Sequence, residues 1–297
     1  MHVLSVSSLK GGVGKTTVAL GLASAAYARG LRTLVVDLDP QCDASTGLGA
    51  FGGSTKSVAD VLSSPRHAVV HDSIVASSWG KVQSGHIDVM LGSPKTLNFD
   101  HPNPTLRDLW RLEEALSIVE RKYDLVLIDT PPSINGLTRT GWVASDRILI
   151  VSEPSIFSVV TADRALKAIN ELRKGLTPRL RALGVIINRV RPGSQEHDFR
   201  IGELKNLFQG EFLTAMLEEK ATVQQAQGAG RPIHTWPGES AAQVAQVFDQ
   251  ILDAAYESFA LVDESRNSKK ERRFGRFSRI LRGKQIDKDL ETGPANG

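Results

Sequence analysis

A glycine-rich segment near the start of the sequence indicates the fold class: Lys10-Gly11-Gly12-Val13-Gly14-Lys15-Thr16-Thr17. It follows a short β-branched run, Val3–Ser8, and it opens a helical pattern that extends from about Thr16 to Arg29. Glycines at such a turn allow backbone N–H groups to surround a phosphate, and the helix N-terminus adds the positive end of its dipole. We therefore expect a phosphate-binding loop, in which Lys15 reaches the terminal phosphates and the Thr16 hydroxyl binds Mg²⁺.

Strand-length apolar runs alternate with helix-length segments along the rest of the chain. The expected strands are Arg32–Asp37, Ile87–Leu91, Asp124–Asp129, Arg147–Val151 and Leu183–Asn188. Two clear helical patterns are Leu106–Lys122 and Ser240–Ala260. Continuous apolar strands separated by helices are typical of a parallel sheet that is covered on both faces. We predict a three-layer α/β P-loop NTPase fold, with a twisted, mostly parallel sheet and helices on both faces.

Composition narrows the class of protein. The chain has 297 residues, of which 41% are hydrophobic and 23% are charged, as in an ordinary globular protein. Its single cysteine, Cys42, cannot form an intramolecular disulfide or a thiolate cluster, so we expect a reducing, cytoplasmic compartment. The first residues lack a basic region followed by a long apolar stretch, and no window has the ~18 apolar residues of a membrane span.

Positive charge is concentrated near the C-terminus. The segment 266–284 contains nine Lys or Arg residues and one acid, Glu271, which gives it a net charge of +8. Because the whole chain carries +3, the other residues sum to −5. Apolar periodicity also fades after Val262. We therefore expect an ATPase-type domain over 1–262 and a basic, flexible tail over 263–297.

Three aspartates at strand ends are candidate site residues, and two of them, Asp39 and Asp129, are candidate metal ligands. Asp129 ends an apolar strand, where a carboxylate can hold Mg²⁺-bound water close to the phosphates. Asp37 and Asp39 lie two residues apart at another strand end, so their side chains are expected on the same side. His67 and His71 have the spacing of a metal-binding helix, but no acidic or thiol partner follows them, and we expect no metal there.

Three motifs together resemble the nucleotide site of the ParA/MinD family, P-loop ATPases with a deviant Walker A box. They are KGGVGKTT over 10–17, VDLDPQ over 36–41 and DLVLIDTPPS over 124–133. The strict P-loop pattern would have a glycine at Leu9, and this loop has Lys10 after it instead. The resemblance covers about residues 1–260. It implies ATP and Mg²⁺ as cofactors and an ATP-dependent homodimer in which Lys10 reaches the phosphates of the opposite subunit.

The resemblance also assigns roles to individual residues. Asp39 falls in the first switch segment, where it would position or activate the attacking water. Asn188 matches the asparagine that contacts adenine, and the Thr17 hydroxyl would help to hold the α-phosphate. The expected catalytic residues are Lys10, Lys15 and Asp39. The expected nucleotide-binding residues are Lys10, Gly11, Gly12, Val13, Gly14, Lys15, Thr16, Thr17 and Asn188, and the expected metal-binding residues are Thr16, Asp39 and Asp129.

One segment, Leu217–Ile233, departs from chromosomal ParA proteins. Glu219 and Thr222 occupy the positions of two arginines that contribute to DNA binding in the family, and a carboxylate would repel the DNA backbone. Glu218 replaces the usual proline, whereas Arg231 keeps a basic residue at the family's lysine position. Binding of DNA through this part of the domain is therefore not expected from the resemblance alone.

The basic tail offers an alternative surface contact. Phe274, Phe277, Ile280 and Leu281 would share one face of a short helix within 272–284, surrounded by arginines. Such a helix suits an anionic membrane surface, but the same arginines could neutralise DNA phosphates. A solvated tail or a protein-docking segment is the third alternative.

The expected function is that of a ParA-like ATPase. By resemblance, it would dimerise on ATP, bind nucleoid DNA or a membrane, and release that surface on hydrolysis, thereby partitioning or positioning cargo. A ParB-like or other adaptor protein would accelerate slow hydrolysis. Two alternatives remain: a MinD-like membrane-bound positioning ATPase, and a metabolic ATP-dependent enzyme. Accordingly, we expect a cytoplasmic protein associated with the nucleoid or peripherally with the membrane.

Overall fold

A mostly parallel sheet forms the centre of the computed structural model, which describes residues 1–53, 55–82, 85–210 and 212–261. Its eight strands follow the order β3-β4-β2-β5-β1-β6-β7-β8. β3 pairs antiparallel with β4, and the other pairs among the described residues are parallel. The strands are β1 His2–Ser7, β2 Arg32–Asp37, β3 Ile74–Val82, β4 Gly85–Met90, β5 Leu125–Asp129, β6 Arg147–Ser152, β7 Arg181–Val190 and β8 Phe212–Glu218.

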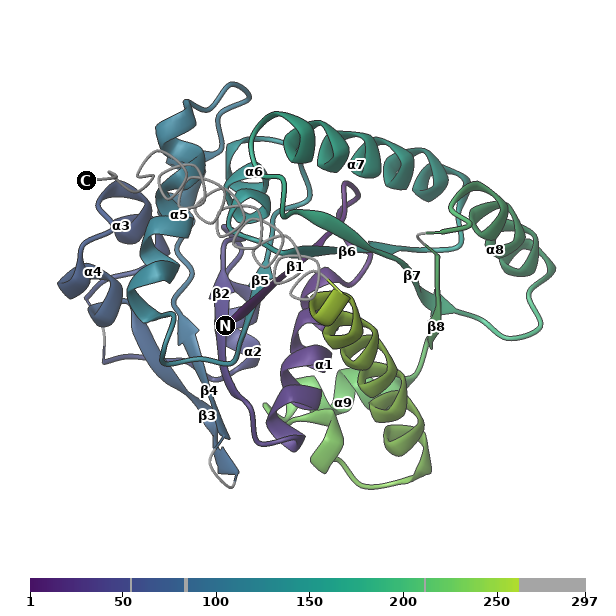
Figure 1. The fold of residues 1–297 in the computed structure, drawn as a ribbon. Coiled ribbons are helices and arrows are strands. Elements are labelled where there is room, and N and C mark those ends of the chain that lie inside the picture. The colour runs from purple at the N-terminus through teal and green to yellow at the C-terminus, as the bar shows by residue number, and fades with distance from the viewer. Residues whose placement is uncertain (54, 83–84, 211, 262–297) are drawn as a thin grey trace, which may run out of the picture. The chain divides into compact units, whose positions relative to one another are not determined.

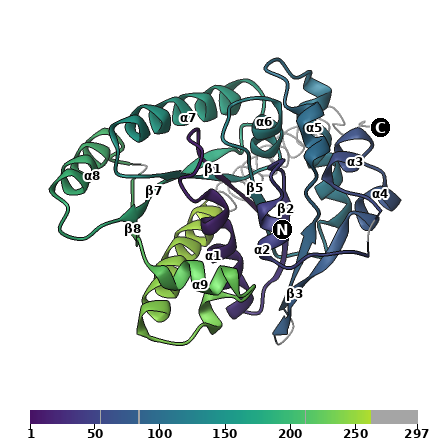
Figure 2. The ribbon, with the colours of Figure 1, turned by 180° about the vertical axis from the view of Figure 1, so that it is seen from behind.

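Helices cover both faces of this sheet, as Figures 1 and 2 show from opposite sides. One face carries α5, α6 and α7, and the other carries α1, α9 and a helix that includes residues 239–255. The helices are α1 Lys15–Ala28, α2 Asp43–Gly47, α3 Val58–Ser63, α4 His67–Asp72, α5 Leu106–Val119, α6 Gly136–Val143, α7 Ile156–Gly175, α8 Gln195–Leu207 and α9 Ala221–Gly228, with 3₁₀ turns η1 Pro94–Phe99 and η2 Ile233–Thr235. The predicted three-layer architecture is confirmed.

The chain divides into two compact units, 1–255 and 256–297, and the sheet and the candidate site belong to the first. The expected basic tail over 263–297, with its amphipathic segment 272–284, lies outside the described residues. Among the described residues, no helix combines the length and the apolar character needed to cross a lipid bilayer.

The phosphate loop is followed by a helix that is buried along most of its length. α1 begins after Gly14, whose φ of 89° lies in the left-handed region that favours glycine. The helix ends at Gly30, also left-handed, where the N–H of Leu31 donates to the carbonyl of Ala26. Nearly all residues between these glycines are buried, so α1 fixes the loop against the sheet.

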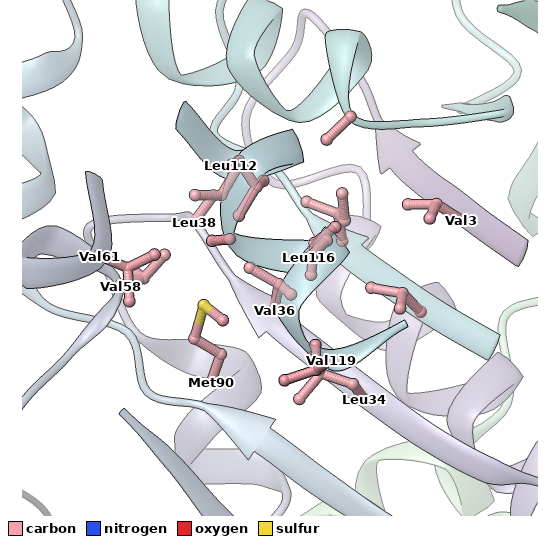
Figure 3. Packing of buried hydrophobic residues seen from close by; sticks show 14 of the residues in the cluster. Val3, Leu34, Val36, Leu38, Val58, Val61, Met90, Leu112, Leu116 and Val119 are labelled. Atoms are coloured by element: carbon pink, nitrogen blue, oxygen red, sulfur yellow. The ribbon is translucent and has the colours of Figure 1, made fainter. Parts of the chain in front are cut away.

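A hydrophobic cluster packs α5 against the other half of the sheet. α5 begins at a capping box formed by Thr105 and Asp108, and it buries residues at helical spacing along one side. Figure 3 shows this side facing strand residues of β2 and β4. The helix contributes Leu112, Leu116 and Val119, and the strands contribute Leu34, Val36 and Met90. This packing holds β2 and β5 rigidly at the point where their acidic residues follow.

The sequence did not predict every element. Two edge strands, β3 and β8, were not assigned, nor were the helices α2, α3, α4, α6, α7, α8 and α9. β3 begins within a stretch, 64–85, that has no clear apolar periodicity. Edge strands are exposed on one side, so they lack the continuous apolar run by which central strands are recognised.

Candidate functional site

The site lies where the carboxyl ends of β1, β2 and β5 meet. Asp37 on β2 is paired in register with Asp129 on β5, and Val6 on β1 is paired with Asp129 from the other side. The phosphate loop follows β1, and Asp39 follows β2. Ligands of open α/β sheets bind at this edge of the strands.

A cleft of about 550 Å³ opens over this edge. Its volume is within the usual range for sites that bind small ligands. The predicted loop residues Gly11, Gly12, Gly14, Lys15, Thr16 and Thr17 line it, together with Asp39, Pro40, Gln41, Asp43, Leu97, Asp100, Pro131, Pro132, Ser133 and Arg189. The structure therefore brings the loop and residues of the other two motifs, 36–41 and 124–133, to a single cavity.

Thr16 and Asp129 are in direct contact. The Thr16 hydroxyl donates a hydrogen bond of 2.6 Å to Asp129 Oδ2, and the Asp129 carboxylate is fully buried. Lys15 is also buried, with 6% of its surface exposed. These residues join the first turn of α1 to the end of β5, which is the contact expected of a Mg²⁺-binding threonine and its aspartate.

Asp37 is held by a residue that the sequence analysis did not identify. Its Oδ2 atom accepts hydrogen bonds of 2.7 Å from both the backbone N–H and the hydroxyl of Ser45, in α2. The Ser45 hydroxyl in turn accepts a bond of 2.9 Å from the Gly92 N–H. Asp37 therefore anchors the segment that contains Asp39. None of the three sequence motifs indicates that α2 brings Ser45 to this carboxylate.

The buried carboxylates favour a cation between them. Burial, followed by the charge of Asp37, raises the pKa of Asp129 to about 8. Burial also raises the pKa of Asp37 to about 6, with smaller contributions from Asp39 and Asp43. Within the described part of the chain, Asp129 Oδ1 and Asp37 Oδ1 have no hydrogen-bond donor. Unsatisfied anionic oxygens at this depth fit a hard divalent cation or the water bound to it.

Protein groups alone do not complete a metal site here. No group of three or more His, Cys, Asp or Glu side chains that could hold a metal ion occurs in the described residues. A cation at this position would need further oxygen ligands, which nucleotide phosphates and water supply in P-loop sites. Asp39, 8% exposed, uses its Oδ1 atom to accept the Gln41 N–H at 3.0 Å, so its other oxygen is not engaged in that turn.

Lys10 forms an ion pair within its own chain. Its Nζ atom lies 2.9 Å from Glu153 Oε2, and the Arg189 guanidinium binds the other oxygen of Glu153 at 3.0 Å. Glu153 directly follows β6, the neighbour of β1, which is why the two loops meet. The Lys10 side chain is still 35% exposed, so it can leave this pair for another partner.

Asn188 supports the phosphate loop through a hydrogen bond to its backbone. Its amide donates to the Val13 carbonyl at 2.7 Å, and the Asn188 side chain is almost fully buried. A Cβ atom on Gly14 would lie 2.3 Å from Asn188 Nδ2. Asn188 therefore has a structural contact that the sequence did not predict, beside the adenine contact expected by resemblance.

A second cleft, of about 390 Å³, continues from Thr17 and Asn188 toward the segment that departs from the family pattern. Glu219 does not stand alone there, since its carboxylate lies 2.6 Å from Arg191 Nε. Thr222 is almost buried, with 9% of its surface exposed, and so cannot serve as a surface contact. Neither of these two positions therefore presents a basic side chain to solvent, although Arg191 beside Glu219 is itself exposed.

Comparisons with known proteins identify the family. An AAA domain model matches residues 1–182. The chromosome partitioning protein ParA of Caulobacter vibrioides is 30% identical over 239 residues, which cover 78% of this chain and 86% of that protein. This chain belongs to the ParA family of P-loop ATPases. An uncharacterized protein of Methanocaldococcus jannaschii is also 30% identical, over 251 residues that cover 82% of this chain and 95% of that protein.

Solved structures support the fold of the ParA family. The structure of apo McdA from Cyanothece superposes with a TM-score of 0.72 and 21% identity, over 86% of this chain and 99% of that one. At this identity the likeness concerns the fold, and the roles of individual residues rest on the geometry described above.

Proposed function

We propose that this ParA-family chain is a Mg²⁺-dependent ATPase that dimerises on ATP and uses the dimer to hold a negatively charged surface. The observation that carries the proposal is the Thr16–Asp129 hydrogen bond next to a buried Lys15, in a loop that lines the cleft and that begins with the partly exposed Lys10. Hydrolysis would return the protein to monomers that release the surface. Partition or positioning of DNA or another cargo would follow from this cycle.

Each residue has a role that its surroundings support. Lys15 would neutralise the terminal phosphates, and backbone N–H groups of Gly11 to Thr17 would surround them. Thr16 and Asp129 would orient Mg²⁺, which when bound would neutralise phosphate charge. Asp39 would align the attacking water, because it lines the cleft and its position is fixed through the turn with Gln41.

Lys10 and Asn188 complete the proposed nucleotide site. Lys10 would exchange its contact with Glu153 for phosphates bound to the other subunit, and its partial exposure makes this exchange accessible. Asn188 would face the base from the second cleft while its amide keeps the bond to Val13. Thr17, which lines both clefts, would contact the α-phosphate between them.

The surface contact is proposed for the basic segment 266–284. Its net charge of +8 contrasts with a domain in which Glu219 pairs with Arg191. Two tails in one dimer would bind with greater avidity than a single tail, since the second contact becomes intramolecular. Nucleoid DNA and anionic membrane are both candidates, and an adaptor such as a ParB-like protein would stimulate hydrolysis.

The proposal is tested with three variants in one pair of assays, ATP turnover and light scattering after size exclusion. Lys15→Ala should lose both turnover and the ATP-dependent dimer, and Lys10→Ala should lose the dimer but keep nucleotide binding. Asp39→Ala should form an ATP-bound dimer that hydrolyses slowly. Lys167→Ala, an exposed lysine on α7, is the matched control and should resemble the parent protein. Normal turnover in Asp39→Ala, or a dimer in Lys15→Ala, would overturn the proposed roles.

The bound surface is identified by flotation with anionic vesicles, with duplex DNA as competitor, in ATP and in ADP. ATP-dependent flotation that is lost on truncation after Asp263 would assign the tail to the membrane. ATP-dependent retention on DNA, lost by the same truncation, would assign it to the nucleoid. Undiminished attachment by Lys15→Ala would separate attachment from nucleotide and refute the switch.

A further inference from the structure

A second polar cavity lies away from the phosphate loop, at the end of the sheet where β2, β4 and β5 begin. Figure 1 shows α4 and α5 beside β3 and β4 in this part of the molecule. The cavity has a volume of about 540 Å³, which is large enough for a small metabolite. It is lined by Arg32, His71, Ile74, His86, Asp88, Arg121, Lys122 and Tyr123. The nucleotide site uses none of these residues.

The acidic groups of this cavity already have partners. The Tyr123 hydroxyl donates to Asp88 Oδ2 at 2.8 Å, and His86 Nε2 lies 3.3 Å from the same oxygen. Arg32 is paired with Asp124 through its backbone N–H, its Nε atom and its NH2 group, at 2.7 to 3.1 Å. Within the described ranges, neither Asp88 nor Asp124 forms an ion pair with a further cation on the rim.

Two cations on the rim lack such a partner. Within the described ranges, neither Arg121 nor Lys122 forms an ion pair, and both side chains are exposed. Lys122 Nζ instead lies 3.2 Å from His71 Nδ1, a neutral acceptor. A concave site with two uncompensated cations attracts an anion. We propose that this cavity binds a small phosphate monoester, with Arg121 and Lys122 as the groups that hold its phosphate.

Asp88 limits the kind of ligand that the cavity accepts. Its carboxyl group lines the cavity and accepts hydrogen bonds, so a ligand hydroxyl could also donate to it. Duplex DNA is disfavoured, because proteins that bind its backbone neutralise about 6–10 phosphates and this cavity offers two such cations. A phosphate monoester with an uncharged, hydroxyl-bearing body would suit both the two cations on the rim and the Asp88 carboxyl group.

His71 provides a direct reporter of occupancy. Burial lowers its pKa, and the charges of Lys122 and His67 lower it further, while Asp72 on the same helix raises it. A phosphate placed beside Lys122 would offset that positive charge and would bring two negative charges close to the imidazole. The pKa of His71 should therefore rise when the site is filled.

The test uses the full chain with saturating ADP and Mg²⁺, so that the phosphate loop is occupied. Ribose 5-phosphate, inorganic phosphate and neutral ribose are added separately, and the His71 imidazole is followed by NMR between pH 5 and 8. Both phosphates should raise the pKa of His71, ribose 5-phosphate at lower concentration, and ribose should have no effect. Vesicles containing phosphatidic acid are a fourth arm, which reveals whether the phosphate monoester of a lipid is accepted as well.

Variants connect the effect to the cavity. Arg121→Gln and Lys122→Gln should each weaken ribose 5-phosphate binding about tenfold, as loss of a charged hydrogen bond predicts. Arg107→Gln, an exposed arginine near the other end of α5, is the matched control and should bind normally. If the double variant Arg121→Gln/Lys122→Gln bound ribose 5-phosphate as tightly as the parent protein, the proposed site would be refuted. An unchanged His71 titration at about 10 mM phosphate, ten times a millimolar Kd, would refute it as well.

Discussion

Replacement of Gly14 by alanine would test how the phosphate loop is held. Gly14 has a φ of 89°, and a Cβ atom there would lie 2.3 Å from Asn188 Nδ2. Asn188 is almost buried and donates to the Val13 carbonyl, so its side chain cannot withdraw without losing that bond. Two separable costs result: strain of the backbone and loss of the hydrogen bond.

The structure sets the size of both costs. A left-handed backbone conformation costs an alanine about 1–2 kcal/mol. Leaving the Val13 carbonyl buried without its donor costs about 1–3 kcal/mol. Gly14→Ala should therefore lower the free energy of unfolding by about 2–5 kcal/mol, and Asn188→Ala alone by about 1–3 kcal/mol. In the double variant the bond is lost only once, so the two effects should overlap by about 1–3 kcal/mol.

Urea unfolding of the nucleotide-free parent, the two single variants and the double variant measures this overlap. Gly202→Ala is the matched control, because Gly202 lies within α8 with no atom near its Cβ position. That substitution should raise stability by about 0.5–1 kcal/mol through helix propensity. If Gly14→Ala and Asn188→Ala add to within about 0.5 kcal/mol, the contact between them does not hold the loop.

Three further predictions concern buried or paired polar groups. Burial raises the pKa of Asp129 from 3.8 to about 8, so the folded state binds its proton more tightly than the unfolded state, and nucleotide-free protein should lose stability as pH rises between these values. Asp129→Asn should remove that loss and be the more stable protein at pH 8; equal urea profiles at that pH would contradict this. Ser7→Ala removes the acceptor that lies 2.9 Å from Trp142 Nε1, and it should lower the free energy of unfolding in urea by about 1–3 kcal/mol. An unchanged free energy of unfolding would show that this hydrogen bond does not stabilise the fold. Glu153→Gln weakens a partly exposed pair with Lys10 and should cost less than about 1 kcal/mol, so a greater loss in the same assay would indicate a structural role.

Local sequence signals predicted the centre of the fold well. The strands β2, β5 and β6 are continuous apolar runs because both of their faces are covered by helices. The edge strand β8 is less regular, and its register with β7 shifts at two points. Whether such a segment forms a strand depends on its pairing with the neighbouring strand, which the pattern of its own residues does not reveal.

The candidate site could be predicted where its residues end an apolar strand, but not where it depends on contacts between distant segments. Asp37 and Asp129 were found because both end apolar strands, and the structure pairs them in register. Glu153 was missed, although it also follows an apolar strand, since its importance depends on the proximity of β6 to β1. Neither the pairing of β1 with β5 nor the bond from Asn188 to Val13 can be inferred from local periodicity, because each joins residues more than a hundred positions apart.

The central position of β1 has a consequence for biosynthesis. This strand pairs with β5 on one side and with β6 on the other. Because β1 precedes both partners along the chain, it has no partner until β5 is made and is enclosed only after Ser152. Until then the nascent chain carries an apolar strand and an unfinished nucleotide loop, a state in which long-range pairing is slow and chaperones protect exposed segments.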